Sequence, residues 1–272
     1  MKVLELNNNQ IKKIQQIEIK LLLEVDKICK ENNINYSLIG GTLIGAIRHK
    51  GFIPWDDDID IMMTRDNYDK FCKLIESKNY DDFYLVNAYS TKYCGCTFSK
   101  IMAKNTIMRE ISISRNQAPC GVFIDIFPID YASNDKFERE KDFKIAKRIK
   151  RNLYCREGYY YEQKGLKYFL FLLNGCVLKL IPKKYFLKKF DKLLKKYKDT
   201  NYIISYSGTY PLEKETHNSS VFTNYISVEF EGHYVSAIEN FDEFLKDTYG
   251  DYMKLPPKDQ QIAHHYIVDL KI

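Results

Sequence analysis

The stretch Ile39-Gly-Gly-Thr-Leu-Ile-Gly-Ala-Ile-Arg48, followed by Gly51-Phe-Ile-Pro-Trp-Asp-Asp-Asp-Ile-Asp60, holds the densest chemistry of this chain of 272 residues. Its first half contains a pair of glycines after an isoleucine, and its second half contains four aspartates within five residues. The aspartates run directly into the apolar residues Ile61-Met-Met63, which would anchor them in a core. A solvated acidic turn rarely continues in this way. The stretch therefore predicts carboxylates that are held in place at the edge of a hydrophobic core.

We predict a half-buried strand over residues 58–63, because polar and apolar residues alternate there. Residues two apart on a strand share a face, so Asp58 and Asp60 would point the same way. Two carboxylates held so close repel each other unless a cation or a proton lies between them. Hard oxygen ligands suit Mg²⁺, or Mn²⁺ in its place. A calcium-binding EF-hand loop is excluded, because its glycine and glutamate positions hold Ile61 and Asn67.

The glycine pair lies between a predicted strand over residues 34–39 and a predicted helical turn over residues 42–48. Backbone N–H groups at the start of a helix can bind a phosphate group, so we expect Gly40, Gly41 and Thr42 to contact one. The chain has no P-loop motif. Two glycines alone would be weak evidence, but together with the Asp-x-Asp strand they favour metal-assisted phosphoryl chemistry.

The two quoted stretches resemble the LicD family, part of the nucleotidyltransferase superfamily that includes DNA polymerase beta-like enzymes and fukutin-related proteins. The likeness spans residues 15–265. It also covers the acidic segment Gly121–Asp130 and the C-terminal segments Tyr249–Met253, Leu255-Pro-Pro257 and His264-His265. The resemblance implies an enzyme that transfers phosphocholine, or a similar phospho-alcohol, from a CDP-linked donor and releases CMP. The acceptor would be a hydroxyl of a cell-surface glycan of the teichoic acid, lipopolysaccharide or capsule type.

The resemblance also implies a mixed sheet, with the glycine turn beside its first strand and the Asp-x-Asp pair on its second. A third carboxylate then comes from a neighbouring strand, and Asp125, which lies between two isoleucines, is the preferred residue. Asp130 follows a proline; it is the alternative and is expected to be a turn or cap residue. Asp56 would be an additional or indirect metal ligand, whereas Asp57 would point the other way and be exposed.

By this resemblance, Asp58, Asp60 and Asp125 form the catalytic and metal-binding set. Five further residues are candidates for substrate binding: Arg48, Trp55, Lys100, His264 and His265. The two cations would contact phosphate oxygens, and the tryptophan could face a choline cation, which aromatic rings attract. The histidines could bind the acceptor. Each candidate has a structural alternative, namely a surface position, packing of a loop or a place in the C-terminal tail.

The remaining pattern predicts an α/β (α+β) protein, with a nucleotidyltransferase-like mixed sheet flanked by helices and a basic helical insertion. Helices are predicted over residues 9–33, 66–78 and 241–249, the second capped by Asp66 and the third ended by Pro256-Pro257. Strands are predicted over residues 83–88, 97–103, 121–127 and 222–230, the third ending before Pro128 and the fourth followed by a turn at Glu231-Gly232. Residues 135–198 predict helices broken near Gly158, Gly165, Gly175 and Pro182.

We expect one compound catalytic domain over residues 1–272. It would consist of a nucleotidyltransferase-like core over residues 1–134, a basic helical segment over residues 135–200 and a C-terminal portion over residues 201–272 that packs on the core.

The net charge of +6 is the sum of two unlike parts. Residues 141–198 contain 18 Lys and Arg against 4 Asp and Glu, a balance of +14, and the rest of the chain contains 24 against 32, a balance of −8. Such a segment suggests contact with a polyanion or a membrane. We expect residues 166–198 to contact an anionic membrane or the glycan acceptor, with a lysine-covered helical bundle as the alternative. No nucleic-acid partner is expected, because no binding module accompanies the charge.

The sequence starts without the apolar region of a secretory signal. Its longest apolar run, Tyr168–Leu178, is shorter than the roughly 20 residues of a spanning helix. The seven cysteines form no CxxC pair and are expected to be reduced thiols. We therefore expect a cytoplasmic protein, peripheral at the inner face of the membrane if residues 166–198 bind lipid.

Two other functions stay open at this point. The same carboxylates would serve a nucleotidyltransferase that adds NMP from an NTP to a small molecule. A non-catalytic metal-binding or glycan-binding module on the same fold is the second alternative. The sequence identifies neither the transferred alcohol nor the acceptor sugar.

Overall fold

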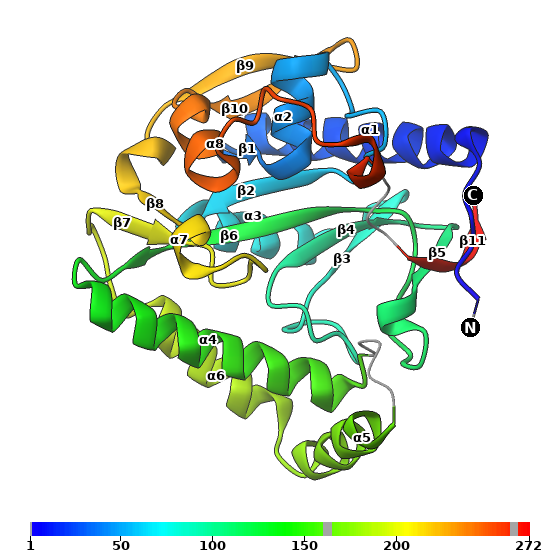
Figure 1. The fold of residues 1–272 in the computed structure, drawn as a ribbon, viewed down its shortest axis with the longest axis vertical. Helices are drawn as coiled ribbons and strands as arrows, with labels where there is room; N and C mark the ends of the chain where they lie inside the picture. Colours follow the sequence, from blue (N-terminus) through cyan, green and yellow to red (C-terminus); the bar gives the residue numbers. More distant parts are fainter. Residues whose placement is uncertain (1, 160–164, 262–265) are drawn as a thin grey trace.

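A computed structural model describes residues 2–159, 165–261 and 266–272. Its centre is a mixed sheet with the strand order β1-β2-β6-β4-β3, in which β2 and β6 are parallel and the other neighbours antiparallel (Figure 1). The far end of β6 pairs with β7, and β7 pairs with β8. These strands are β1 Ser37–Leu38, β2 Asp60–Thr64, β3 Phe83–Val86, β4 Ser99–Ala103, β6 Phe123–Ala132, β7 Tyr202–Ile204 and β8 Thr216–Asn218.

Helices flank the sheet, and two separate two-stranded pairs complete the described structure, so the predicted class is confirmed. The helices are α1 Asn8–Glu31, α2 Gly40–His49, α3 Arg65–Glu76, α4 Lys136–Glu157, α5 Leu166–Lys179, α6 Lys183–Leu194, α7 Leu212–Glu215 and α8 Phe241–Tyr249. The strand pairs are β5 Ile107–Glu110 with β11 Ile267–Lys271, and β9 Tyr225–Phe230 with β10 His233–Ile238. Short 3-10 turns occupy Ile111–Ile113, Ser219–Phe222 and Lys258–Gln260.

The long helix α1 forms where its apolar spacing predicts it. Asn7 caps its start: the side chain accepts hydrogen bonds from the N–H groups of Asn9 and Gln10, and the Gln10 side chain accepts one from Asn7 N–H at 3.0 Å. This reciprocal arrangement is a capping box, which satisfies N–H groups that have no partner within the helix.

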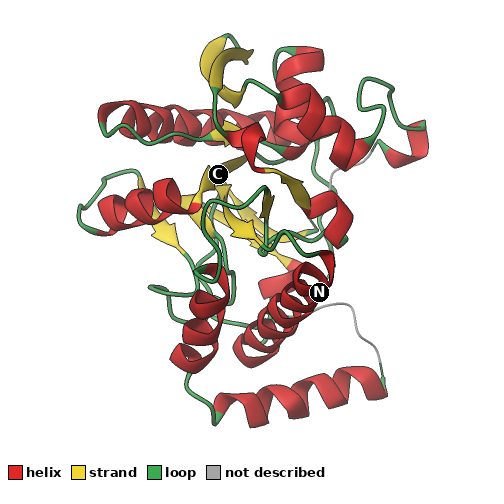
Figure 2. Cartoon of the chain, turned by 90° about the vertical axis from the view of Figure 1, so that its left-hand side faces the viewer, coloured by secondary structure: helices red, strands yellow, loops and turns green. Residues whose placement is uncertain are grey.

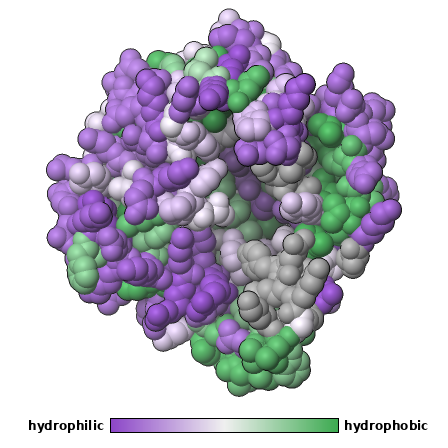
Figure 3. Space-filling view, in the orientation of Figure 1, coloured by the Kyte–Doolittle hydropathy of each residue, from purple (hydrophilic) through white to green (hydrophobic). Residues whose placement is uncertain are grey.

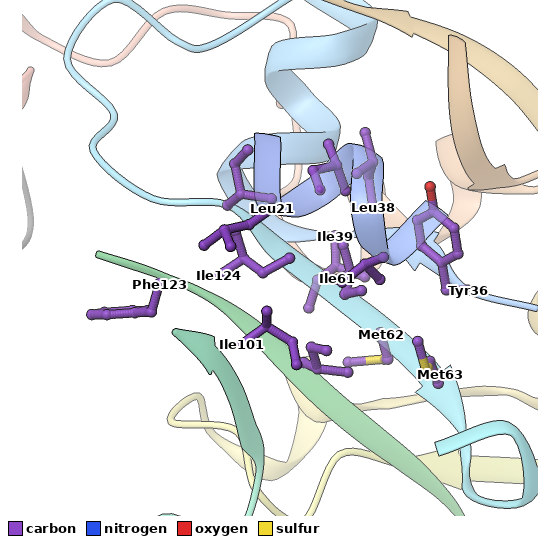
Figure 4. Packing of buried hydrophobic residues seen from close by; sticks show 14 of the residues in the cluster. Leu21, Tyr36, Leu38, Ile39, Ile61, Met62, Met63, Ile101, Phe123 and Ile124 are labelled. Carbon is purple, nitrogen blue, oxygen red and sulfur yellow. The ribbon is translucent and has the colours of Figure 1, made fainter. Parts of the chain in front are cut away.

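Side chains alternate along each strand, so the central sheet has two faces. We call the face under α1 and α3 the covered face, and the face that carries Asp60 and Asp125 the site face. Paired residues on neighbouring strands share a face, so the register places the covered-face residues Ile61, Ile101, Ile124 and Ile126 together. All four are buried, and Figure 4 shows Ile124 beside Leu21 of α1. Tyr68 of α3 shares a hydrogen bond with Ser99 on the same face. The alternate residues Asp60, Met62, Lys100, Asp125 and Phe127 share the opposite face.

The strand β6 is longer than predicted, because it continues through Pro128 to Ala132. Proline has no N–H group for a ladder and is tolerated where a strand has an open side. Pairing with β4 ends at Ile126, and pairing with β7 begins at Asp130, so Pro128 lies in the gap between these two partners. The prediction that Asp130 is a turn or cap residue is therefore wrong.

Several other boundaries differ from the predictions. Thr64, not Asp66, is the N-cap of α3, and β2 begins at Asp60 instead of residue 58. Gly175 does not break a helix but lies inside α5, where an added Cβ would lie 2.7 Å from the Cys155 carbonyl of α4. This glycine allows the two helices to approach closely. The helix α8 has its predicted bounds, but Gly250 is its C-cap, and the proline pair lies further along the chain. The short strands β5, β7, β8 and β11 were not predicted.

The C-terminal residues pack on the first part of the chain. Ser236 of β10 donates a hydrogen bond to the Tyr36 carbonyl at 2.6 Å, and Ile238 N–H donates one to Ser37 Oγ at 2.9 Å. Phe52 N–H donates to the carboxylate of Glu231, which stands at the hairpin turn between β9 and β10. The described part of the helical segment contributes to a second buried cluster, formed by α4, α5 and α6 with β7 and the end of β6. That these parts form one compound domain stays a prediction.

Candidate active site

The N-terminus of α2 faces the aspartates because its first residues are glycines. Gly40 has a φ of +60°, and an added Cβ there would lie 3.2 Å from Asp60 Oδ2. An added Cβ on Gly41 would collide with the carboxylate of Asp56. Ile39 is the N-cap and makes no side-chain cap bond to the helix. The positive end of a helix therefore lies against the acidic loop, residues 56–59. This arrangement suits an anion, or a cation that is itself bound to an anion.

The acidic loop gathers a different trio of carboxylates from the predicted one. Within the described residues, oxygens of Asp56, Asp57 and Asp58 lie within 4.8 Å of one another. Asp58 precedes β2 and does not share a strand with Asp60. Asp57 is 1% exposed, so the prediction that it is exposed is wrong. A turn at residues 54–55 precedes the three aspartates, which lie outside the regular part of β2.

Asp60 and Asp125 are neighbours across the parallel strands β2 and β6, as the third-carboxylate prediction requires. Burial, together with the charges of Glu110 and Asp58, raises the pKa of Asp125 to about 6 against the lowering effect of Lys100. The Lys100 ammonium lies 3.0 Å from Asp125 Oδ1. The structure thus places Asp58 and Asp60 near Asp125, which also forms an ion pair with Lys100.

Lys100 is largely buried, with its ammonium 3.2 Å from the ring centroid of Phe123 and 3.9 Å from Glu110. Its pKa is raised, because the carboxylates of Asp125 and Glu110 outweigh the opposing effect of burial. The predicted contact with a phosphate is not what this geometry favours, since the ammonium faces the carboxylates of Asp125 and Glu110.

A cleft of about 680 Å³ lies over these elements. Its floor carries Gly40, Gly41, Asp56, Asp58 and Asp60, together with Met62 and Phe127 from the site face. Arg48 and Trp55, two of the residues predicted to bind substrate, also line it. Arg48 donates a hydrogen bond to the Tyr252 carbonyl at 2.7 Å and so joins α2 to the opposite wall.

Among the predicted site residues that the structure describes, Thr42, Lys100 and Asp125 do not line this cleft. Thr42 is buried outside the cleft, and its hydroxyl accepts a hydrogen bond from Asp60 N–H at 2.9 Å, which fixes the start of β2. His264 and His265 fall outside the described residues. Thr42 therefore positions the start of β2, which carries the carboxylate of Asp60. Because Thr42 does not line the cleft, its position does not support the predicted contact with a phosphate.

The far wall of the cleft comes from residues that the sequence did not single out. They are Ser205, Gly208, Thr209, Tyr210, Lys214, Glu215, His217, Phe244, Thr248, Asp251 and Lys254. Tyr249 and Tyr252 also line it, and the segment Tyr249–Met253 was the available signal, because it belongs to the family resemblance. Glu215 had no such signal.

Glu215 is buried in that wall. Its Oε1 accepts a hydrogen bond from Tyr210 N–H at 2.8 Å. Burial raises its pKa to about 7, opposed by the bond from Tyr210 and the charges of Lys150 and Lys147. Lys150 comes from α4 and donates hydrogen bonds to the carbonyls of Ser207 and Gly208 at 2.7 and 2.5 Å. The basic segment thus holds the loop that lines the cleft.

The residues present fit a divalent cation. Asp56, Asp57 and Asp58 offer oxygens close enough to share one ion, and Asp60 lines the same cleft. Carboxylate oxygens are the ligands that Mg²⁺ and Mn²⁺ prefer. The glycines of α2 leave room for the carboxylates of Asp56 and Asp60 beside the N-terminus of this helix.

Residues 33–163 match the protein family described as LicD/FKTN/FKRP, nucleotidyltransferase domain. A protein of Haemophilus influenzae, described as lipopolysaccharide cholinephosphotransferase LicD, is 31% identical over 277 aligned positions, which cover 97% of each chain. Uncharacterized proteins of Rickettsia typhi and Rickettsia prowazekii match shorter segments. The first is 34% identical over 76 residues, 26% of this chain and 25% of that protein. The second is 48% identical over 42 residues, 15% and 16% of the two chains.

The Haemophilus match runs almost from end to end and includes the glycine and aspartate stretches that form the floor of the cleft. The chain therefore belongs to the LicD family.

Proposed function

We propose that the protein transfers phosphocholine from CDP-choline to a hydroxyl of a lipopolysaccharide and releases CMP. The observation that carries this proposal is the end-to-end similarity to a protein described as a lipopolysaccharide cholinephosphotransferase. A cleft in which carboxylates face the N-terminus of a helix supports it, because a metal-bound diphosphate needs both features.

We assign different roles in phosphoryl transfer to different residues of the site. Asp56, Asp58 and Asp60 would hold Mg²⁺ or Mn²⁺, which when bound neutralises charge on the donor diphosphate. The N-terminus of α2 orients the same diphosphate. The acceptor oxygen forms a bond to the phosphorus that bears choline, and the bond from that phosphorus to the bridging oxygen of CMP breaks. Asp125 is the candidate acceptor of the hydroxyl proton, since it lies beside Asp60 on the site face.

The test measures CMP release from CDP-choline by Asp58→Ala and Asp60→Ala, with magnesium present or chelated. Both variants and the chelated enzyme should lose activity, because charge on the diphosphate is then left uncompensated. Asp66→Ala, an exposed aspartate of α3, is the matched control and should stay active. Full activity in either site variant would overturn the metal assignment.

The same assay separates the alternative functions. Release of pyrophosphate from an NTP, with no CMP from CDP-choline, would favour NMP transfer to a small molecule. Donor binding by calorimetry without turnover would favour a non-catalytic module.

We also propose that the protein acts in the cytoplasm in peripheral contact with an anionic membrane through residues 166–198. Within the described residues, no helix is both long and apolar enough to cross a membrane. Instead, α5 lies across one end of the molecule (Figure 2), where apolar side chains gather on the surface (Figure 3). Leu166, Phe169 and Leu180 are 72%, 61% and 84% exposed. An apolar patch of this kind marks an interaction site.

The charge around α5 favours an anionic bilayer as the partner. Lys179 at its end is exposed, as are Lys184, Lys188 and Lys189 of the following helix. A helix with an apolar surface and nearby lysines can lie in the interface of a membrane. Sedimentation with anionic and neutral vesicles across a salt series tests this proposal. Leu173→Glu should abolish the binding and Tyr234→Glu, an exposed site on β10, should not. A dimer in light scattering, without vesicle binding, would contradict it.

A further inference from the structure

Glu215 is a buried carboxylate that the transfer chemistry does not use. It lines the same cleft as the aspartates, but it belongs to the opposite wall. In the described part of the chain, its hydrogen bond comes from Tyr210 N–H, and no cationic side chain forms an ion pair with it. A carboxylate taken out of water without a cationic partner is costly. A cation that enters the cleft would remove this cost.

Aromatic rings stand between Glu215 and the aspartates. Tyr210 and Tyr249 are in edge-to-face contact, with ring centroids 5.8 Å apart and an interplanar angle of 89°. Tyr249 is close enough to both Asp60 and Glu215 for both charges to raise its pKa, beyond the larger effect of burial. Its hydroxyl would lie 3.7 Å from a Cβ on Gly40, at the phosphate end of the cleft. The tyrosine pair thus connects the phosphate end with the carboxylate of Glu215.

Aromatic faces and a carboxylate together attract a quaternary ammonium group, which has no hydrogen to donate and binds through its charge. Lys214 already lies 5.9 Å from the ring centroid of Tyr210, so one face of that ring attracts a cation in the structure. We propose that Glu215, Tyr210 and Tyr249 form the subsite for the quaternary ammonium of the transferred alcohol. This inference rests on the proposed function, because it assigns the end of the cleft that the choline of the donor would occupy.

The test compares the affinity for CDP-choline with that for CDP-glycerol, a donor with the same nucleotide and a neutral alcohol. Glu215→Gln keeps an acceptor for Tyr210 N–H and removes the charge. It should weaken CDP-choline binding about tenfold and leave CDP-glycerol binding unchanged. Glu213→Gln, an exposed glutamate of the same helix, is the matched control and should change neither.

A second pair of variants tests the ring. Tyr249→Phe keeps the aromatic face and should bind CDP-choline like the wild type, whereas Tyr249→Leu should lose affinity for CDP-choline alone. This pair decides the question if Glu215→Gln fails to fold. A folded Glu215→Gln protein with unchanged CDP-choline affinity would overturn the subsite, even if the wild type transfers phosphocholine. A wild type that binds and transfers from CDP-glycerol but not from CDP-choline would instead overturn the proposed function.

Discussion

Arg65 of α3 holds Asp130 of β6 through two hydrogen bonds, from Nε to Oδ1 at 2.7 Å and from Nη2 to Oδ2 at 2.9 Å. Asp130 lies five residues after Asp125, and an odd separation on a strand places two side chains on opposite faces. Asp130 therefore points to the face covered by α1 and α3, and Asp125 points to the site face. Of the two candidates for the third carboxylate, Asp125 is the one that shares a sheet face with Asp60.

Asp130→Asn should destabilise the protein by about 3–5 kcal/mol, because it removes the buried charge partner of the largely buried Arg65 guanidinium and leaves only the more exposed Asp69. Urea unfolding followed by circular dichroism measures the change. Asp69→Asn removes a more exposed partner of the same arginine and should cost less than about 1 kcal/mol. A fully stable Asp130→Asn protein that has lost CMP release would give Asp130 a role in the site.

Gly41→Ala should lower CMP release about a hundredfold, because the added methyl group displaces the carboxylate of Asp56 from the acidic loop. Gly175→Ala provides the contrast, since its methyl group presses on the Cys155 carbonyl of α4, far along the basic segment. That variant should unfold at a lower temperature and keep its KM for CDP-choline. Steady-state kinetics and thermal melts of both proteins check this prediction. Unchanged kinetics in Gly41→Ala would contradict the assigned position of Asp56.

Affinity for CDP-choline should rise severalfold from pH 6 to pH 8. Burial raises the pKa of Glu215 to about 7, so this carboxylate becomes charged, and attracts the ammonium, only as the pH passes that value. The groups that face it are Lys150 and Lys147 of α4, whose charges oppose the shift, and Tyr210 and Tyr249 of the cleft wall. Calorimetry at several pH values measures the slope. Glu215→Gln should flatten it, and an equally steep slope in this variant would assign the titration to another group.

The same shift affects stability. A carboxyl group with a raised pKa binds more protons in the folded state than in the unfolded state between the two pKa values. The contribution of Glu215 to stability therefore falls as the pH rises from 4.5, the ordinary pKa of this side chain, to about 7, its pKa in the folded protein. In Glu215→Gln this part of the pH dependence of urea unfolding should disappear.

Lys150→Met should raise the KM for CDP-choline and lower stability by about 1–3 kcal/mol. The reason is that the carbonyls of Ser207 and Gly208 lose the donor that holds the loop of the cleft wall. Lys147→Met, an exposed position one turn earlier on α4, is the control and should leave both quantities near wild type. A Lys150→Met enzyme with unchanged KM would show that the loop keeps its position without the basic segment.

The sequence alone determined the parts of this protein that depend on local pattern. The apolar spacing of α1 and the glycine pair before Thr42 each specify a local structure within a few residues. The strand pattern before Met63 specifies which side chains share a face. The family also follows from contiguous residues, because the glycine and aspartate stretches are short and dense.

Only the tertiary structure decided how distant segments meet. The loop before β2 turns Asp57 inward, and the pairing with Arg65 gives Asp130 its role; neither follows from residues near these aspartates. Glu215 faces the aspartates because short strands, too brief for a periodic signal, fold the chain back across β6. Burial then sets its pKa, and burial depends on every segment packed around it.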